Sequence, residues 1–543
     1  MFSSKRLSLL DFNENNLCVT DRALTFDSHD SFEMATRITI VFPKSLSLSR
    51  LEDAWYALVQ TWPILAARIR ADPSAPSGLS YFIPQPATLA AIESESRKAS
   101  DPKQKHILLV DLSSRSISIY HPIVGKAVAD GLSRDKASVG SAPDREEQNK
   151  VTCANATKTF KELLKADQAS VTAQATKWAD ATSVTISFNH SLGDAFSIQS
   201  IFAGWQATIN GSIPEELQDV GKDPFIEYFE DAKRSRTKGT DGREVKPGYG
   251  EGWKKFGFIS KMRLIANLLW DIKVKRPEKS IGQYYIYLPE EKVQELLAQA
   301  KSDIAHLQES TSSSSGDLEK QQSTRDLNVS TFNVLFAWLL QNIHAANAKP
   351  KQRSTVLAIV NLKARPPTGH IPSDYPAHQM WGGAFAAPLL PLTSHQYTTL
   401  PIGEIALHIK ESLKDQVSAE NMHARLVTLL DTTSWKKPSK KLIFCAKPTD
   451  FWCGCTDWRR AQFGQVDFAA ASADAEVQEE KLGVGETASV KPVAFGAHME
   501  IPMTPRNRWV LFGEAGKGVW FSGAMTRKEA RHEKGFGRYP FVQ

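Results

Sequence analysis

The chain has 543 residues, more than one ordinary hydrophobic core accommodates, so two or three domains are expected. Hydrophobic residues make up 41% of it and charged residues 23%, a composition that excludes general disorder. The 66 basic and 60 acidic residues leave a diffuse net charge of +6, and no Lys/Arg block is interleaved with aromatic residues, which argues against nucleic-acid binding.

Cysteine usage and hydropathy predict a soluble cytoplasmic protein in a reducing compartment. The N-terminal stretch has no sustained apolar core of the kind found in signal peptides, and no apolar run reaches the roughly 18 residues that span a bilayer. The cysteines are odd in number and lack the paired spacing of a zinc site, so free thiols and no bound metal are expected. They are Cys18, Cys153, Cys445, Cys453 and Cys455.

The N-terminal part of the chain mixes strands and helices on one core. Alternating hydrophobicity predicts strands at residues 37–42 and 106–120, and helical spacing predicts helices at 48–62 and 158–167. The polar stretch at 133–150 is expected to be a surface loop or insertion.

The most informative stretch is Thr185–Trp205. Its first half alternates apolar and polar residues, which predicts a strand with one buried face, and its second half has helical spacing. His190 therefore falls at a strand-to-helix turn, exposed at the mouth of a sheet, and Asp194 is placed to cap the following helix. A histidine there titrates near neutral pH and suits a general base.

A catalytic role is not the only interpretation of this HxxxD pattern. His190 could instead be a structural histidine with satisfied hydrogen bonds. The chain also contains a second HxxxD pattern at His370–Asp374, but prolines surround it and no strand or helix is predicted beside it, so we interpret it as a chance occurrence.

The middle of the chain changes composition. Residues 214–252 are charged and rich in proline and glycine, which is typical of a crossover. In the next segment, Trp253–Arg276, lysine and arginine are interspersed among large apolar residues. Such a segment is either a membrane-surface helix or an ordinary packed helix whose lysines extend to solvent.

A second series of strands and helices follows from Tyr284. Helices are predicted from Glu290 to about Leu307, from Ser330 or Thr331 onward, and at 400–414. Between them lie a Ser-rich polar insertion at 309–326 and an apolar strand at 355–362.

The residues His190–Asp194, between a strand and an amphipathic helix, resemble the HxxxD motif of the BAHD acyl-CoA-dependent acyltransferases, in particular their fungal branch. Four further blocks are similar to motifs of that family and occur in the same order. They are the helix at 51–70, the helix start at 330–340, the strand at 360–365, and the pair Thr456-Asp457-Trp458 with Val466-Asp467-Phe468.

The resemblance implies an α/β fold with two similar chloramphenicol-acetyltransferase-like domains. Each would be a mixed sheet with flanking helices, and the active-site channel would lie at their interface. The corresponding division is an N-terminal domain at 1–213 carrying HxxxD, a crossover at 214–280, and a C-terminal domain at 281–543.

The resemblance also implies roles for individual residues. His190 would be the base, with Thr456 and the indole N–H of Trp458 as candidate donors to the oxyanion. Asp194 would give structural support by pairing with an arginine, for which Arg365 is the candidate and Lys363 the alternative. Asp467 would hold a loop.

The implied activity is transfer of an acyl group other than aminoacyl (EC 2.3.1.-) from acyl-CoA, with acetyl-CoA expected. The acceptor would be a hydroxyl, or an amine, of a specialised metabolite or glycolipid. Acyl-CoA would be a co-substrate, with no permanently bound cofactor, and a monomer is expected. The apolar stretch 253–270 could form a lid over the channel that favours an amphiphilic acceptor, or rest on a membrane.

Two other functions stay open at this point. A condensation-type domain shares HxxxD but takes its acyl group from a carrier protein, and it usually has a second histidine where this chain has Asn189. An inactive binding protein of the same fold is the other alternative, because residues 467–471 read Asp-Phe-Ala-Ala-Ala and lack the Gly-Trp-Gly half of the family motif.

Overall fold

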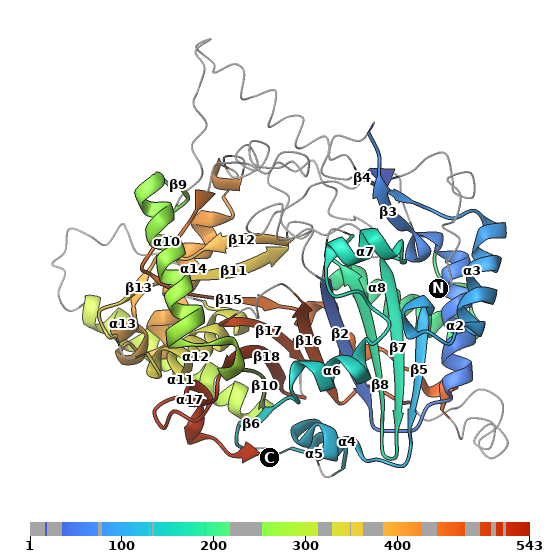
Figure 1. Ribbon diagram of the computed structural model, residues 1–543. Helices are drawn as coiled ribbons and strands as arrows, with labels where there is room; N and C mark the ends of the chain where they lie inside the picture. The colour runs from blue at the N-terminus through green and yellow to red at the C-terminus, as the bar shows by residue number, and fades with distance from the viewer. Residues whose placement is uncertain are drawn as a thin grey trace.

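Two large mixed β-sheets, each packed against helices, form the framework of the molecule (Figure 1). The computed structural model describes residues 17–18, 35–73, 79–129, 131–132, 135–190, 192–217, 252–312, 328–347, 349–361, 384–418, 420–422, 424, 443–472, 489–500, 506–513 and 517–543.

The first sheet has five strands and contains the strand that precedes His190. That strand, β8, lies at the centre and pairs antiparallel with a neighbour on each side. In spatial order the strands are β16 (Ala494–Glu500), β2 (Ala35–Phe42), β8 (Thr182–Asn189), β7 (Val171–Trp178) and β5 (Ile107–Leu112).

Both faces of β8 are covered, whereas the sequence predicted one buried face. All eight residues of the strand are buried. Val184 and Ile186 join the main apolar core, while on the polar face the Thr185 hydroxyl lies 2.8 Å from that of Thr39. The helix α6 (Arg145–Thr152) contacts β7 and β8, so polar residues here are enclosed and hydrogen-bonded instead of solvated.

The second sheet has nine strands and lies beside the helices of the C-terminal half. Its strands in spatial order are β12 (Ala384–Pro388), β11 (Arg353–Asn361), β15 (Phe451–Asp457), β17 (Arg508–Gly513), β18 (Val519–Thr526), β10 (Ile281–Leu288), β6 (Ser138–Ser141) and β19 (Phe541–Val542), with β13 (Leu392–Thr393) also paired to β11.

Each sheet contains one strand from the distant half of the chain. β6 comes early in the sequence but pairs with β10, and β16 comes late but pairs with β2, beside which Figure 1 draws it. The sheets therefore do not follow a simple division of the chain at residues 213 and 281, and the division into domains stays a prediction.

Two expectations for the N-terminal half are wrong. Residues 133–150, expected as a surface loop or insertion, are not a loop but contain β6 and most of α6. A short strand of small residues joins a sheet through its backbone, and here Val139 is also buried. The strand expected over 106–120 ends at Leu112, and Ser116 then caps the short helix α4 (Ile117–Tyr120).

The helices otherwise begin and end close to the predicted residues. On the five-stranded sheet α2 packs against α8, and in the C-terminal half α11, α12 and α14 contact one another. Their bounds, with those of the remaining helices of eight or more residues, are α2 (Leu48–Thr61), α3 (Pro86–Lys98), α5 (Pro122–Ala129), α8 (Ala195–Ile209), α10 (Phe258–Trp270), α11 (Glu290–Ser312), α12 (Thr331–Ala345) and α14 (Ile402–Gln416); the short helix α7 covers Phe160–Ala166.

Two smaller observations bear on the expectations from composition. Among the described residues, no helix combines the length and the hydropathy needed to cross a bilayer. Cys153, Cys445, Cys453 and Cys455 are buried thiols.

Candidate active site

His190 follows directly on β8, in the turn that leads to α8. The imidazole is half-buried, with its ring centroid 6.0 Å from that of Phe188, so it is more enclosed than the expected exposure at the mouth of the sheet. Burial lowers the pKa of His190 below its usual value, and the Asp194 carboxylate opposes part of that shift. At neutral pH the ring is therefore uncharged and able to accept a proton.

Asp194 caps α8, which confirms the predicted N-cap. Its Oδ1 accepts hydrogen bonds from the backbone N–H of Phe196 at 3.0 Å and of Ser197 at 3.3 Å. The Ser197 hydroxyl accepts in return from the Asp194 N–H at 3.1 Å, which completes a capping box. The carboxylate is thus committed to the first turn of the helix and fixes the turn that carries His190.

The C-terminal end of α8 is hydrogen-bonded to α2. The Trp205 indole N–H donates to the carbonyl of Leu51 at 3.1 Å, and the Thr208 hydroxyl donates to that of Ala54 at 2.9 Å. Gly204 lies against Trp62, where a Cβ would meet the ring at 2.5 Å. This close approach allows the two helices to pack and sets the position of α8 against the sheet.

Thr456 and Trp458 lie at the end of β15 in the other sheet. Thr456 is half-buried between Ile359 of β11 and Val510 of β17. Trp458 is buried with its ring edge against Phe512, at 5.3 Å between centroids. It belongs to the main apolar core, as does Leu192.

The segment after Trp458 packs along α8 and joins the two sheets. The 3₁₀ turn η7 (Arg459–Ala461) contacts α8, and Phe463 meets Phe202 edge to face at 6.0 Å. The Asp467 N–H donates to the Gln206 side chain at 2.8 Å. The structure thus brings the HxxxD helix and the last sequence block together.

Asp467 makes loop contacts. Its carboxylate accepts from the backbone N–H of Ala469 at 3.0 Å and of Val490 at 2.9 Å, and from the Ser489 hydroxyl at 2.6 Å. These bonds tie residues 489–490 to the turn at 467–469. A purely structural role remains a prediction that these contacts favour.

Some of the residues named from the sequence lie outside the described residues. Lys363 and Arg365, the candidate partners of Asp194, are among them, as is His370. The ion pair of Asp194 stays a prediction.

Sequence reasoning missed Ser197 and Gln206. Ser197 could have been found, because a hydroxyl three residues after an N-cap aspartate can accept from the N-cap N–H and complete a capping box. Gln206 gave no local signal, since its partner Asp467 is distant in the chain. Among the described residues, no three His, Cys, Asp or Glu side chains are placed to hold a metal ion, and the expectation that none is bound stays a prediction.

Comparisons with known proteins show which proteins the chain is similar to. No family model matches the chain. It is 55% identical over 515 residues to acetyltransferase MATC1 of Mycosarcoma maydis, and 53% identical over 513 residues to acetyltransferase MAT1 of Pseudozyma antarctica (strain T-34). Each alignment covers 94% of this chain and 95% of the relative.

The fold is also that of a solved fungal protein. The structure of TRI101 of F. sporotrichioides complexed with coenzyme A and T-2 superposes with a TM-score of 0.57 at 13% identity, covering 96% of this chain and 98% of the other. The relatives show that the chain is an acyltransferase (EC 2.3.1.-), which confirms the activity class expected from the sequence. The chain belongs to the acetyltransferase family of MATC1 and MAT1.

Proposed function

We propose that this acyltransferase moves an acetyl group from acetyl-CoA to a hydroxyl of a specialised metabolite or glycolipid, with His190 as general base. The observation that carries the proposal is the position of His190, uncharged in a turn that β8 and the Asp194 cap hold between sheet and helix. The names of the relatives and the coenzyme A bound in the TRI101 complex support the reaction type.

The reaction needs one base and no covalent acyl-enzyme. The neutral His190 ring accepts the hydroxyl proton as the acceptor oxygen attacks the thioester carbonyl carbon. The tetrahedral oxyanion then collapses, the carbon–sulfur bond breaks, and the histidine returns the proton to the leaving sulfur. The products are the ester and free coenzyme A, and His190 is again neutral.

Thr456 and Trp458 are the proposed donors to the oxyanion. Thr456 is half-buried near the end of β15, and Trp458 precedes the segment that packs along α8. Loss of one donor of this kind typically costs about 2.7 to 4 kcal/mol of transition-state stabilisation. Thr456→Val should therefore lower kcat more than it raises KM.

Asp194 acts in this proposal as a positioning residue. It holds the turn through the helix cap and pairs with Arg365 or Lys363, while Asp467 holds the loop beside α8. We further propose a monomer that works in the cytoplasm.

Two measurements test the reaction itself. Purified protein is incubated with acetyl-CoA or with acetyl groups on a carrier protein, together with a metabolite extract, and acetylated products are detected by mass spectrometry. Products only with acetyl-CoA support the proposal. Products only with the carrier would identify a condensation-type enzyme, and none with either would identify an inactive binding protein.

The base is tested by His190→Ala. We expect turnover to fall by about 10²-fold or more, with coenzyme A affinity and melting temperature close to those of the unchanged protein. The matched control is His370→Ala in the second HxxxD pattern, which should retain full activity. An active His190→Ala protein would remove His190 from the mechanism.

A further inference from the structure

The helix α10 exposes a continuous apolar surface. None of its residues is buried, and the packed-helix interpretation of this segment is wrong for α10. Single exposed apolar residues are ordinary, but a contiguous set of this size marks a contact surface. The exposed members are Phe258 (78%), Ile259 (67%), Met262 (49%), Ile265 (48%), Leu269 (52%) and Trp270 (60%).

These side chains form one stripe along the helix. Phe258, Met262, Ile265 and Leu269 recur at three- and four-residue spacing, so they lie above one another on one face. Ser260, Leu264 and Lys261 are the less exposed residues and lie on the side turned to the protein. The apolar face therefore points outward.

The surroundings of the stripe are basic. Between residues 252 and 277 the chain has one acidic residue, Asp271, and many cations. Asp271 is itself paired with arginines, its carboxylate lying 2.9 Å from Arg276 and 3.5 Å from Arg506. The cations of this segment are Lys254, Lys255, Lys261, Arg263, Lys273, Lys275 and Arg276.

Both ends of the segment are anchored to the protein. At the start, Trp253 and Phe256 are buried, and β9 (Lys254–Lys255) pairs with β14 (Ile443–Phe444). Phe256 thus belongs to the interior and not to the exposed surface.

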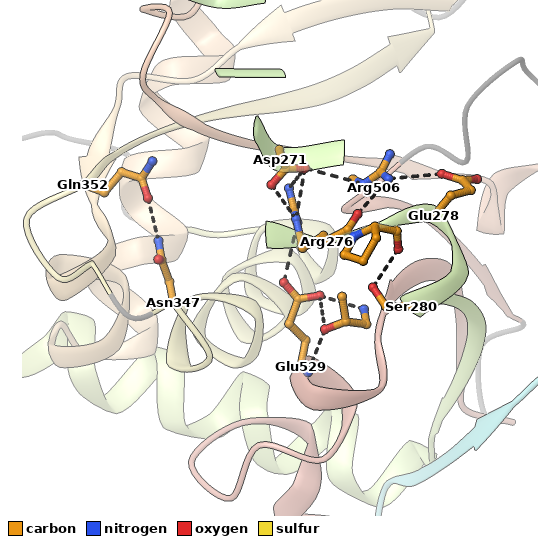
Figure 2. Close-up of polar contacts among 10 residues, drawn as sticks. Asp271, Arg276, Glu278, Ser280, Asn347, Gln352, Arg506 and Glu529 are labelled. Carbon is orange, nitrogen blue, oxygen red and sulfur yellow. Dashed lines mark hydrogen bonds and ion pairs between the residues drawn. The ribbon is translucent and has the colours of Figure 1, made fainter. Parts of the chain in front are cut away.

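The other end is anchored by ion pairs. Figure 2 shows Arg276 between Asp271 and Glu529, and Arg506 reaching from Asp271 to Glu278 at 3.1 Å. Arg506 also donates to the carbonyl of Arg276 at 2.9 Å. Because both ends are fixed, the protein presents the apolar face of α10 outward instead of folding it inward.

The position of α10 separates it from the candidate active site. Figure 1 draws α10 at the left of the view, on the side of the nine-stranded sheet, whereas β8 and α8 lie in the right half. The lid over the channel that was considered for this segment stays a prediction.

We propose that α10 is a docking surface for an anionic membrane. Lying parallel to the bilayer, the helix would place the apolar stripe at the boundary of head groups and acyl chains, with Arg263 and the neighbouring lysines on the lipid phosphates. Charge complementarity favours this occupant over a second copy of the chain. A two-fold dimer would bring the same cations of both copies together around the stripe, and like charges facing one another are unfavourable.

The test uses vesicle flotation with the full-length protein. Vesicles of phosphatidylcholine alone, or with about a third phosphatidylserine, are floated at low and high salt with four proteins. These are the unchanged chain, Phe258→Ser/Leu269→Ser, Arg263→Glu/Lys273→Glu, and the matched control Ile119→Ser/Ile213→Ser. Ile119 and Ile213 are 79% and 89% exposed elsewhere on the surface.

The unchanged chain should float with the anionic vesicles and less with neutral ones. The double serine change in α10 should reduce binding about tenfold or more, and the glutamate changes should remove the preference for anionic lipid. The control should float like the unchanged chain. No binding to either vesicle, or equal losses in the control and the α10 variant, would overturn the proposal.

Trp270 provides a second readout. Lipids brominated on their acyl chains should quench part of the fluorescence of the unchanged chain, and Trp270→Phe should remove that part. A dimer in sedimentation that Phe258→Ser/Leu269→Ser converts to monomer, without vesicle binding, would identify a second copy as the occupant and refute a membrane. Neither readout depends on the transferase reaction, so the proposal stands or falls separately from the role of His190.

Discussion

Asp194 and Ser197 cap one another across the first turn of α8, each accepting a hydrogen bond from the backbone N–H of the other. Because His190 lies in the turn just before this box, the same bonds that begin the helix also set the position of the imidazole. The stability of the helix and the proposed catalysis by His190 therefore both depend on Asp194, and substitutions there separate the two.

Asp194→Asn should retain a cap and Asp194→Ala should not. We expect the free energy of unfolding to rank unchanged protein, Asn, then Ala, with about 0.5 to 2 kcal/mol lost with the cap. Urea denaturation measures the order. An Asp194→Ala protein as stable as the unchanged chain but inactive would instead mean that the carboxylate takes part in the reaction directly.

The acid limb of the pH profile of kcat/KM should lie at low pH. Since burial lowers the pKa of His190, the base stays deprotonated, and kcat/KM should hold at pH values below about 6.5, the ordinary histidine pKa. Asp194→Asn removes the negative charge that opposes this shift and should move the limb to still lower pH. Asp467→Asn is the comparison and should leave the limb in place. An acid limb above pH 7 in the unchanged protein would argue against His190 as the titrating group.

A second histidine, His106, should make the fold sensitive to acid. Its Nδ1 accepts from the Trp55 indole N–H at 2.7 Å and its Nε2 lies 3.2 Å from the carbonyl of Leu65, so the buried ring is neutral. Burial lowers the pKa of His106 to about 4. As pH falls below about 6.5, His106 becomes protonated in the unfolded chain but stays neutral in the folded chain. The free energy of unfolding therefore declines by about 1.4 kcal/mol per pH unit until about pH 4.

The measurement is urea unfolding between pH 7.5 and 4.5. His106→Asn keeps an acceptor for Trp55 and cannot titrate, so its stability should fall less steeply with acid than that of the unchanged chain. His306→Asn, at an exposed site, should follow the unchanged chain. Equal slopes for the unchanged and His106→Asn proteins would show that this ring is not responsible.

Gly204→Ala should destabilise the packing of α8 on α2. The added methyl would lie 2.5 Å from Trp62 and 2.8 Å from Leu58, and such overpacking typically costs about 1 to 3 kcal/mol. The melting temperature and kcat should both fall, because α8 begins with the cap beside His190. Gly257→Ala, where a Cβ meets nothing within 4 Å, is the control and should melt close to the unchanged protein. Equal melting of the two variants would contradict the close contact.

Arg506→Met tests the ion pairs at the base of α10. The change removes the ion pairs of Arg506 with Asp271 and with Glu278. We expect a loss of about 1 to 3 kcal/mol, less than for a fully buried pair because Glu278 is half-exposed. Arg460→Met, at an exposed arginine, should be neutral in the same unfolding assay. A neutral Arg506→Met would mean that the cluster does not hold the helix.

Local patterns predicted much of this fold. The helix expected at 48–62 covers Leu48–Thr61, Ser330 caps α12 as expected, and the strand expected at 355–362 covers Arg353–Asn361. At the candidate site the strand, the turn and the Asp194 cap were predictable for the same reason, since each depends on residues within a few positions of one another.

Long-range pairing could not be predicted in the same way. Nothing in residues 138–141 indicates a partner in β10, and nothing in Asp467 indicates Gln206. The direction of the apolar face of α10 was equally hidden, because an amphipathic helix has the same sequence whether that face meets a core or solvent. These features depend on what the rest of the chain leaves uncovered.

The exchange of β16 into the first sheet has a consequence for synthesis. Ile40 of β2 pairs with Phe495 of β16. The β2 edge of the sheet therefore stays unpaired until β16 is synthesised, near the end of translation. At about 5–20 residues per second, the wait is on the order of a minute. Over that time β2 offers an unpaired edge of the kind that recruits other chains. Conditions that slow translation should therefore lower the yield of soluble protein even though they leave the free energy of unfolding of the native protein unchanged.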